Sequence, residues 1–350
     1  MRRRSTALAV AAICLAALFA VAFFAPVPYV IMSPGITENT LGTFGGKPVI
    51  TVNGHQTYPT TGHLNLTTVS VTSADYDVRL PQVLDAWLSS TQIVLPRDVI
   101  YPPNQTIQQV EHTNTQEMTD SQSAAVVAGL GEAGIAATDV KVQKVEPDTP
   151  AAGVLHVGDV IGSVDAKPTK TLAELYAAIR AVPPRSPVTL RLLRSGTART
   201  VTITTRPNPK DPSQSQVGFI PELGYDPPFK VDISLGQDIG GPSAGLMFSL
   251  AIYDKITPGS LTGGRFIAGT GTIDATGQVG EIGGIQQKIA GAYDDGARYF
   301  LVPAGNCTEA ASSSLAGKVE LIKVSTLDQA VQALKALDAG NASSFTRCGS

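Results

Sequence analysis

Charged residues are scarce in this chain of 350 residues, because Asp, Glu, Lys and Arg together make up only 16%, against roughly 25% in an average soluble domain. Basic residues are not in excess, since 26 Lys and Arg stand against 29 Asp and Glu. A protein whose main task is to bind nucleic acid needs a basic surface to neutralise phosphates, so this balance argues against nucleic-acid binding. Hydrophobic residues make up 43% of the chain, which is too many for a disordered protein.

Histidine and cysteine are also rare, and their positions exclude several kinds of site. All four histidines precede Ser243. The segment 241–245 fits G-x-S-x-G, but an α/β-hydrolase needs its acid and its histidine after the serine. A triad with its histidine first has no supporting motif around the histidines. No His-Glu-x-x-His occurs, and Cys307 and Cys348 are too far apart for a zinc cluster, so we expect no metal site.

A phosphate-binding G-x-x-x-x-G-K-[ST] motif is missing as well. We therefore expect no ATP hydrolysis and no cofactor. Without an ATP-driven unfolding step, any polypeptide substrate must already be unfolded, flexible or exposed.

The one long apolar run lies at the N-terminus, where residues 7–25 are all apolar and follow three arginines at 2–4. Nineteen residues in a helix nearly cross a hydrocarbon core about 30 Å thick. A cleaved signal peptide has an apolar region of only about 7–15 residues. The run predicts a transmembrane anchor over residues 1–27, with residues 5–25 in the membrane, and a cleaved or lipoprotein signal is the alternative. The arginines favour a cytoplasmic N-terminus, which leaves the rest of the chain extracytoplasmic.

Two of the three cysteines, Cys307 and Cys348, fall in the part that would be exported. An extracytoplasmic location permits a disulfide between them, which would tether the end of the chain. Two unpaired thiols are the alternative.

Composition divides the remaining chain into segments. Residues 28–120 are rich in Thr, Gly, Asn and Pro with short alternating runs, which indicates a β-rich region. Residues 207–228 begin as a Pro-rich polar linker. Gly-rich turns between apolar strands follow over residues 229–337, and residues 338–350 are expected to form a loose tail.

Residues 121–206 carry a pattern of their own: a strand near 140–145, a helix near 172–181, and two further strands. This order, together with Pro-Ala-Ala-Gly and Gly-Asp-Val-Ile in the segment 150–161, resembles a bacterial PDZ domain. The resemblance implies that extended peptides, often C-terminal ones, bind by adding a strand to a sheet edge. The best candidate for the peptide-binding loop is the short segment 129–131, Gly-Leu-Gly. An unrelated small α+β domain is the alternative.

Lys288 is the candidate base for Ser243. A serine hydroxyl is a weak nucleophile until a base takes its proton, and no histidine follows the serine. Ile285, Ile289 and Ala292 form the apolar stripe of a predicted helix, and Lys288 lies on this stripe. Burial and the positive end of the helix dipole both lower the pKa of an ammonium. An exposed lysine that reaches out from the stripe is the alternative.

Three motifs occur in order: Gly-Pro-Ser-Ala-Gly at 241–245, Gly-Thr-Gly at 269–271, and Gly-Gly-Ile-x-x-Lys at 283–288. Together they resemble the proteolytic domain of Lon proteases, which use a serine–lysine dyad. With the apolar span and the PDZ-like segment in front, the whole chain resembles bacterial YlbL-type, PDZ-containing Lon-like serine proteases. The implied fold is an α+β multidomain protein with an N-terminal transmembrane helix, a PDZ domain and a Lon-type α+β proteolytic domain. If residues 28–120 pack on the proteolytic domain, the PDZ domain is an insertion.

The resemblance also implies roles for individual residues. Ser243 matches the nucleophile, Lys288 the general base, and Thr270 the residue whose hydroxyl holds the lysine amine. The turn and oxyanion site then involve four neighbours of the serine: Gly240, Gly241, Pro242 and Ala244. ATP-dependent Lon enzymes carry an acid three residues before the serine, where this chain has Gly240, and Asp238 lies two residues further back.

The sequence thus predicts a membrane-anchored, ATP-independent serine endopeptidase that cleaves exported or membrane-exposed polypeptides, with a PDZ domain for substrate binding or regulation. Expected partners are polypeptide substrates, PDZ-binding peptide termini and the membrane. Because Lon-like domains often assemble into rings, the resemblance also allows a homo-oligomer. Two alternatives remain: a non-catalytic PDZ scaffold whose Lon-like domain binds polypeptides, and a self-processing enzyme of the serine–lysine signal-peptidase type.

Overall fold

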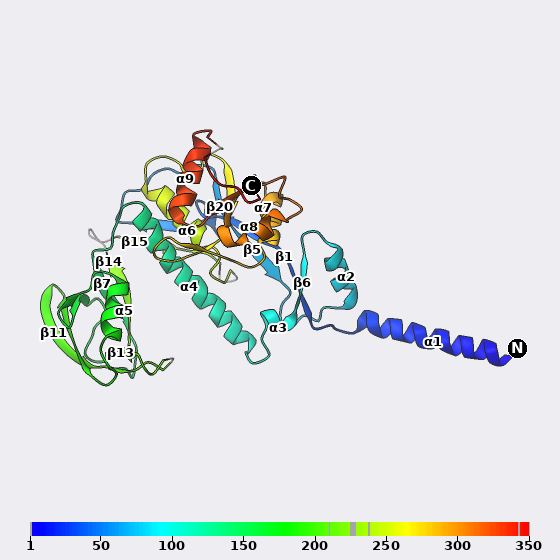
Figure 1. The fold of residues 1–350 in the computed structure, drawn as a ribbon, viewed down its shortest axis with the longest axis horizontal. Coiled ribbons are helices and arrows are strands. Elements are labelled where there is room, and N and C mark those ends of the chain that lie inside the picture. The colour runs from blue at the N-terminus through cyan, green and yellow to red at the C-terminus, as the bar shows by residue number, and fades with distance from the viewer. Residues whose placement is uncertain (1, 210, 225–228, 237–238, 342–343, 350) are drawn as a thin grey trace. The chain divides into compact units, whose positions relative to one another are not determined.

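The computed structural model describes residues 2–209, 211–224, 229–236, 239–341 and 344–349. The chain divides into two compact units, which can be followed by colour in Figure 1. Unit 1 combines Met1–Thr51, Gln56–Ala133 and Val231–Ser350, and unit 2 combines Val52–His55 and Gly134–Lys230. Unit 2 is therefore inserted in the sequence of unit 1.

Helix α1 (Arg2–Phe24) opens unit 1. Its residues Thr6–Phe24 have a mean hydropathy of 2.8, and none of them is buried inside the protein. The helix is long and apolar enough to cross a membrane, and a signal sequence at the N-terminus would have the same properties.

Unit 1 is built on a mixed six-stranded sheet in the order β20-β19-β16-β5-β1-β6. Its strands, in chain order, are β1 (Tyr29–Asn39), β5 (His63–Val71), β6 (Ile93–Pro96), β16 (Phe266–Gly269), β19 (Tyr299–Pro303) and β20 (Glu320–Val324). The strands from β20 to β5 run parallel, and β1 lies antiparallel to both β5 and β6. Because β5 pairs with β16, the β-rich N-terminal region and the region around Ser243 share one sheet.

The helices of unit 1 pack on this sheet. After α1 they are α2 (Leu80–Leu88), α3 (Arg97–Ile100), α4 (Ile107–Glu132), α6 (Gly245–Ile256), α7 (Ile285–Asp294), a 3₁₀ turn η1 (Ala304–Asn306), α8 (Cys307–Ala311) and α9 (Leu327–Asp338). One apolar cluster joins α7 and α8 to β16, β19 and β20. Helix α6 is buried over almost its whole length and contacts α4 and α9 as well as β5. The sheet and α6 thus form the rigid support on which the serine motif is carried.

Four short strand pairs complete the described part of the fold. They pair β2 (Thr43–Phe44) with β3 (Lys47–Pro48), β4 (Ile50–Asn53) with β15 (Lys230–Ile233), β12 (Arg206–Pro207) with β13 (Ser215–Gln216), and β17 (Thr272–Ile273) with β18 (Val279–Gly280).

Helix α4 ends where unit 2 begins, and its C-terminal half packs closely against α6. A Cβ at Gly129 would come within 2.8 Å of the Ser249 carbonyl oxygen, so only glycine fits at this crossing. The sequence predicted the PDZ domain over 121–206 and did not place its peptide-binding loop, for which 129–131 was the best candidate. In the structure residues 121–132 belong to α4, which lies in unit 1. Glycines such as those at 129 and 131 are typical of loops. Small side chains are required as well where two helices pack closely, which is the reason for Gly129.

Unit 2 is an antiparallel sheet in the order β11-β10-β8-β7-β14, with one helix. Its elements are β7 (Asp139–Val145), β8 (Val160–Val164), β9 (Lys167–Pro168), α5 (Leu172–Arg180), β10 (Pro187–Arg194), β11 (Thr197–Thr204) and β14 (Phe219–Gly224). Strand β14 pairs with β7, although the sequence placed residues 207–228 in a linker. The segment begins with several prolines, which indicated a linker. The strand itself is defined by pairing with residues about eighty positions earlier in the chain, which the local sequence does not indicate.

A buried ion pair fixes the loop before β8. Asp159 is 1% exposed and accepts two hydrogen bonds from the Arg194 guanidinium, at 2.7 and 2.8 Å. Burial alone would raise the pKa of the Asp159 carboxyl, but the bonds from Arg194 and from the His156 amide lower it below its usual value. The Gly-Asp-Val-Ile signature is therefore structural, because its acid holds the loop to β10.

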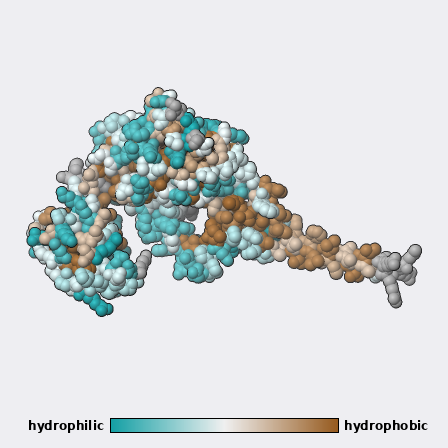
Figure 2. All heavy atoms as spheres, in the orientation of Figure 1, coloured by the Kyte–Doolittle hydropathy of each residue, from teal (hydrophilic) through white to brown (hydrophobic). Residues whose placement is uncertain are grey.

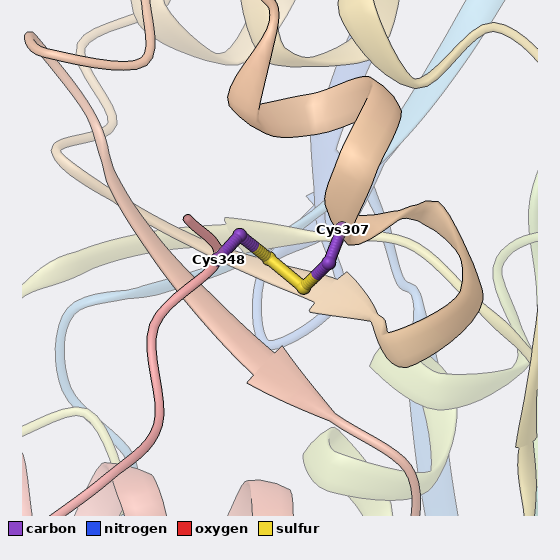
Figure 3. The surroundings of a disulfide bond; sticks show 2 residues. All are labelled: Cys307 and Cys348. Atoms are coloured by element: carbon purple, nitrogen blue, oxygen red, sulfur yellow. A yellow bond between two sulfur atoms is a disulfide. The ribbon is translucent and has the colours of Figure 1, made fainter. Parts of the chain in front are cut away.

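The C-terminal tail, predicted to be loose over 338–350, lies along the outer edge of β20. The Cys348 amide donates to the Leu321 carbonyl at 3.0 Å, and the Lys323 amide donates to the Thr346 carbonyl at 2.9 Å. Figure 3 shows the disulfide that joins Cys348 to Cys307 at the start of α8. The described tail residues therefore cover a sheet edge that would otherwise expose unpaired backbone groups.

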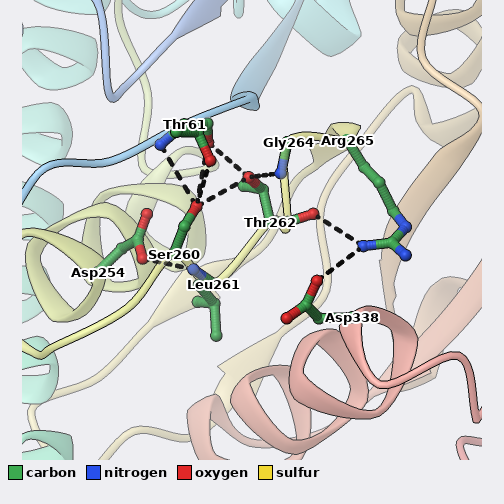
Figure 4. A network of polar contacts seen from close by, with 8 residues as sticks. All are labelled: Thr61, Asp254, Ser260, Leu261, Thr262, Gly264, Arg265 and Asp338. Atoms are coloured by element: carbon green, nitrogen blue, oxygen red, sulfur yellow. Dashed lines mark hydrogen bonds and ion pairs between the residues drawn. The ribbon is translucent and has the colours of Figure 1, made fainter.

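A polar network ties the chain entering β5 to the chain entering β16 (Figure 4). The hydroxyls of Ser260 and Thr262 both bond to Thr61. Beside them, the Leu261 amide donates to the Asp254 carboxylate at 2.6 Å. These contacts set the register at which β5 and β16 begin their parallel pairing.

Candidate active site

Ser243 lies in a turn directly before α6, which begins at Gly245. The turn starts at Gly241, whose φ of +83° is in the left-handed region that favours glycine. The carbonyl oxygen of Ser243 accepts bonds from the Gly271 amide at 2.8 Å and from the Thr270 hydroxyl at 3.0 Å. The segment 269–271 thus fixes the backbone of the serine turn. The side chain of Ser243 is half-buried and faces a cleft.

Lys288 is the fourth residue of α7 and is 2% exposed. The helix starts after Gly284, which has a φ of +69° and lies against β1 and β5. A Cβ at Gly284 would come within 2.8 Å of Val69 and 2.9 Å of Met32, so glycine allows α7 to approach the sheet closely. The lysine amine is thereby carried into the space beside Ser243.

Three oxygen atoms surround the Lys288 amine. Nζ lies 2.7 Å from Ser243 Oγ, 3.1 Å from Thr270 Oγ1 and 3.0 Å from the Thr67 carbonyl oxygen. The Thr67 carbonyl can only accept, and the Thr270 hydroxyl gives its own proton to the Ser243 carbonyl. A neutral amine has two protons for these two acceptors, which leaves its lone pair for the proton of Ser243. All three contacts of the amine are therefore satisfied as hydrogen bonds when Lys288 is neutral and the Ser243 hydroxyl donates to it.

Burial lowers the pKa of Lys288 from 10.5 to about 7. Desolvation is the cause, and no carboxylate contributes to the shift. Charge stabilisation by an acid would have kept the ammonium protonated. The amine can therefore be neutral near pH 7, which is the state that can accept a proton from a hydroxyl.

A cleft of about 260 Å³ opens on this group of side chains. Its lining comes from β1, β5, α4, the serine turn and α7: Gly35, Ile36, Thr67, Thr68, Val69, Ser70, Met118, Ile239, Gly240, Ser243, Ala244 and Lys288. All these residues belong to unit 1. The N-terminal β-rich region thus supplies one wall of the cleft, and the serine motif supplies the other.

Helix α4 holds the serine turn from the other side, which the sequence did not indicate. The Gly241 amide donates to the Asn114 carbonyl at 2.9 Å, and the Ser121 hydroxyl donates to the Pro242 carbonyl at 2.8 Å. A Cβ at Gly240 would come within 3.1 Å of Asn114 Cβ. Thr67 was missed too, because its contribution is a backbone carbonyl, which no residue type reveals.

The remaining predicted neighbours take different places. Ala244 is buried as the residue preceding α6, and the Gly241 amide is already bonded to α4, so it is not a free oxyanion donor. Asp238, considered as a substitute for an acid at Gly240, lies outside the described residues. Among the described residues, no group of three or more His, Cys, Asp or Glu side chains could hold a metal ion.

Unit 2 has a separate groove of about 260 Å³ between α5 and the segment that leads into β14. Tyr176, Ile179 and Arg180 line it from the helix, opposite residues 214–219. Gly218 has a φ of +96°, and a Cβ there would clash with Thr149, so this segment requires glycine. The groove thus has a helix on one side and an extended segment on the other.

Two parts of the chain match known protein families. Residues 107–205 match the family described as PDZ domain, and residues 236–337 match the family described as Lon protease (S16) C-terminal proteolytic domain. The expected combination of a PDZ domain and a Lon-type proteolytic domain in a mixed α/β multidomain chain is confirmed. The PDZ match includes α4, which the structure assigns to unit 1.

Solved structures similar to this chain include PDZ domains. The PDZ domain of an SdrC-like protein from Listeria innocua is 25% identical and covers 24% of this chain and 92% of its own, with a TM-score of 0.22. Its counterpart from Listeria monocytogenes is 26% identical and covers 24% of this chain and 86% of its own, with the same TM-score. A Geobacillus thermodenitrificans protein solved in solution is 28% identical, covers 24% and 95%, and also has a TM-score of 0.22.

Proposed function

Because this chain combines a PDZ domain with a Lon-type C-terminal proteolytic domain, we propose that it is a membrane-anchored, ATP-independent serine endopeptidase in which Ser243 is the nucleophile and Lys288 the general base. The observation that carries the proposal is the 2.7 Å contact between Ser243 Oγ and an amine whose pKa is lowered by burial to about 7.

In the first step, Lys288 accepts the hydroxyl proton while Ser243 Oγ attacks the carbonyl carbon of the scissile peptide bond. The protonated amine stays hydrogen-bonded to the Thr67 carbonyl and the Thr270 hydroxyl, which hold it beside the reacting bond. It then gives the proton to the leaving amine as the peptide bond breaks and the acyl-enzyme forms. In the second step the neutral amine takes a proton from water as the water oxygen attacks the acyl carbon, and the protonated amine then returns this proton to Ser243 Oγ as the ester bond breaks and the acid leaves.

The oxyanion of the tetrahedral intermediate needs N–H donors next to the nucleophile. Amides at the N-terminal end of a helix have no partner within the helix. Within the described part of the chain, the amides of Ser243 and Ala244 donate to no protein acceptor. We assign these two amides as the donors, with the dipole of α6 adding to their effect.

The open edge of β5 suits an extended polypeptide. Pairing with β16 ends where Leu66 meets Gly269, so residues 67–71 have no partner strand on that side among the described residues. Backbone groups of alternate residues face the same edge of a strand, and the Thr67 carbonyl faces Lys288. The Val69 N–H and C=O face the same edge within the cleft. A substrate that pairs there would bring its scissile carbonyl to Ser243, which favours unfolded segments.

The groove beside α5 would bind a peptide by the same principle in unit 2. A C-terminal carboxylate would find the positive charge of Arg180 at one wall and the turn around Gly218 at the other. This peptide would be a substrate terminus or a regulatory ligand. The apolar helix α1 would anchor the enzyme, with the three N-terminal arginines in the cytoplasm and the chain after α1 outside it.

The test uses the full chain in detergent with unfolded casein and with a fluorophosphonate, which phosphonylates an activated serine as fluoride leaves. Wild type should cleave casein without ATP and take up the reagent on Ser243. Ser243→Ala and Lys288→Met should each lose about a thousandfold in kcat/KM. Lys255→Met, which changes a half-buried lysine of α6 outside the cleft, should stay active.

Loss of activity in Lys255→Met, or retention in Lys288→Met, would contradict the assignment of the base. A wild type that neither cleaves casein nor reacts with the fluorophosphonate would favour the non-catalytic PDZ scaffold. Cleavage confined to the enzyme's own residues near α1 would favour a self-processing enzyme.

A further inference from the structure

Helix α2 exposes four large apolar side chains on one face. They follow the helical spacing i, i+4, i+7 and i+8: Leu80, Leu84, Trp87 and Leu88. Trp87 is 78% exposed and Leu88 is 88% exposed. Side chains of this size are rarely left so open in a contiguous group unless another surface covers them. We call these four residues the α2 face.

The α2 face lies beside the end of α1. The Val27 amide donates to the Val78 carbonyl at 2.8 Å, and Pro26 forms a β-bridge with Arg79. Helix α2 begins at the next residue, Leu80. Its first turn therefore lies beside Pro26, which is two residues after the end of α1 at Phe24. Figure 2 shows the apolar surface of α1 continuing onto the neighbouring region of α2 and β6.

We propose that α2 is an interfacial helix whose exposed face lies in the same membrane that α1 enters. The proposal rests on the anchoring role of α1 given under the proposed function. If α1 crosses the bilayer, the bridge between Pro26 and Arg79 brings α2 to the level of the headgroups. There the leucines enter the acyl boundary and the indole of Trp87 takes the position that tryptophan favours in membrane interfaces.

The chemistry of α2 specifies an apolar contact rather than an electrostatic one. Asp85 is the only charged residue within the helix, and its charge is offset by Arg79 directly before the helix, so α2 has no excess of positive charge to attract anionic lipids. Tyr29 and Tyr76, on segments next to α2, are exposed as well. Binding should therefore be equally strong on neutral and on anionic vesicles, and it should change little with salt.

Two consequences distinguish a lipid surface from a second copy of the chain. A membrane contact is present at every protein concentration once α1 is inserted, whereas a dimer contact weakens on dilution. A membrane contact also brings Trp87 within reach of labelled lipids, whereas a dimer shields it from lipid and water alike.

Trp87 is the only tryptophan in the chain, so its fluorescence reports the α2 face without labelling. The experiment reconstitutes the full chain in phosphatidylcholine vesicles and isolates the vesicle-bound protein by flotation. Lipids brominated near the headgroup end of the acyl chain then serve as quenchers. The expected result is a blue-shifted emission that loses most of its intensity in brominated vesicles, with no change when anionic lipid is added.

Leu88→Glu should restore a red-shifted, unquenched emission while the protein still floats through α1. Val157→Glu is the matched control, because it puts the same charge at a 70% exposed apolar residue of unit 2. It should leave the quenching unchanged. Both variants should retain the peptidase activity of wild type towards casein, since neither residue lines the cleft.

Floated wild-type protein with water-like, unquenched tryptophan emission would overturn the proposal and leave the anchor intact. Blue-shifted emission that brominated lipids do not quench would overturn it in favour of a second copy of the chain. Protein that does not float would overturn both the anchor and the interfacial helix. Casein cleavage is read separately, so none of these outcomes is confused with a failure of the catalytic proposal.

Discussion

The proposed chemistry depends, at the residue scale, on whether Lys288 can be neutral near pH 7. Many buried lysines are stabilised as ammonium ions by a carboxylate, and such a lysine is a poor base. The Lys288 amine contacts a carbonyl and two hydroxyls instead, and burial is the cause of its lowered pKa. These neutral partners satisfy the amine without supplying the negative charge that would hold its proton.

The pH dependence of activity follows from this environment. In the proposed mechanism the neutral amine of Lys288 is the base, and its pKa is lowered from 10.5 to about 7. We expect kcat/KM for a peptide without ionisable side chains to rise about tenfold per pH unit below about pH 7 and to level off above it. The measurement is a profile from about pH 5 to 10 on the full chain, with folding checked at each pH. A rate still rising at pH 10 would mean that Lys288 is solvated.

Asp254 gives a stability prediction at the same scale. It is 1% exposed, and its Oδ2 has no hydrogen-bond partner among the described residues. Burial raises the pKa of this carboxyl from 3.8 to about 6. The folded protein therefore holds a proton that the unfolded chain has lost, so the free energy of unfolding falls as pH rises from about 4 to about 6.

Asp254→Asn keeps the acceptor for the Leu261 amide and removes the ionisation. We expect it to raise the free energy of unfolding at pH 7.5 by roughly 1–2 kcal/mol, with no gain at pH 4. Denaturant unfolding at both pH values measures the difference. Asp85→Asn, at an exposed carboxylate of α2, is the control and should change neither value. An equal gain at both pH values would show that ionisation is not the cause.

At the scale of elements, the sequence predicted those parts whose signal is local. The turn glycines, the apolar stripe of α7 and the Gly-Asp-Val-Ile string each specify a short stretch of backbone, and the PDZ and Lon-type domains follow from them. It did not predict contacts set by distant partners. Helix α4 was divided between two segments because its first half is polar and exposed, and only packing against α6 defines its second half. Strand β14 and the tail were missed for the same reason, since their partners are β7 and β20.

The tail along β20 leads to a prediction about redox conditions. The disulfide between Cys307 and Cys348 closes a loop of 41 residues, which in the chain-entropy description is worth about 4 kcal/mol. Replacing both cysteines by serine should lower the Tm of unit 1 by roughly 10 °C and leave the cleft intact. Thermal unfolding of the full chain with and without a reductant measures this effect.

Reduced wild type should unfold at the same temperature as the double variant. Cys14→Ser, which changes the free, exposed cysteine of α1, is the control and should match oxidised wild type. A double variant as stable as wild type would mean that hydrogen bonds to β20 hold the tail without the covalent link.

At the scale of the whole molecule, β1 connects the end of the apolar helix to the catalytic cleft. The strand begins at Tyr29, and its residues Gly35 and Ile36 line the cleft beside Ser243. Gly35 comes nine positions after Pro26, and an extended chain rises about 3.3 Å per residue. With α1 as the proposed membrane anchor, the cleft would therefore stand at most about 30 Å from the membrane surface. The connection is not a free tether, because Pro26 is bridged to Arg79 and β1 is paired on both sides.

A peptidase held at a fixed height should select the position at which it cuts a membrane-anchored substrate. We expect a substrate with its own transmembrane helix to be cleaved once its unfolded segment has about nine residues between the membrane and the scissile bond, since that length spans about 30 Å. Co-reconstituted substrates with spacers of about 3, 6, 9, 12 and 15 residues, read by mass spectrometry, measure the cutting position. Casein, which has no anchor, controls for intrinsic activity. Equal cleavage at a three-residue spacer would mean that the cleft reaches the membrane surface, and β1 would then not act as a spacer.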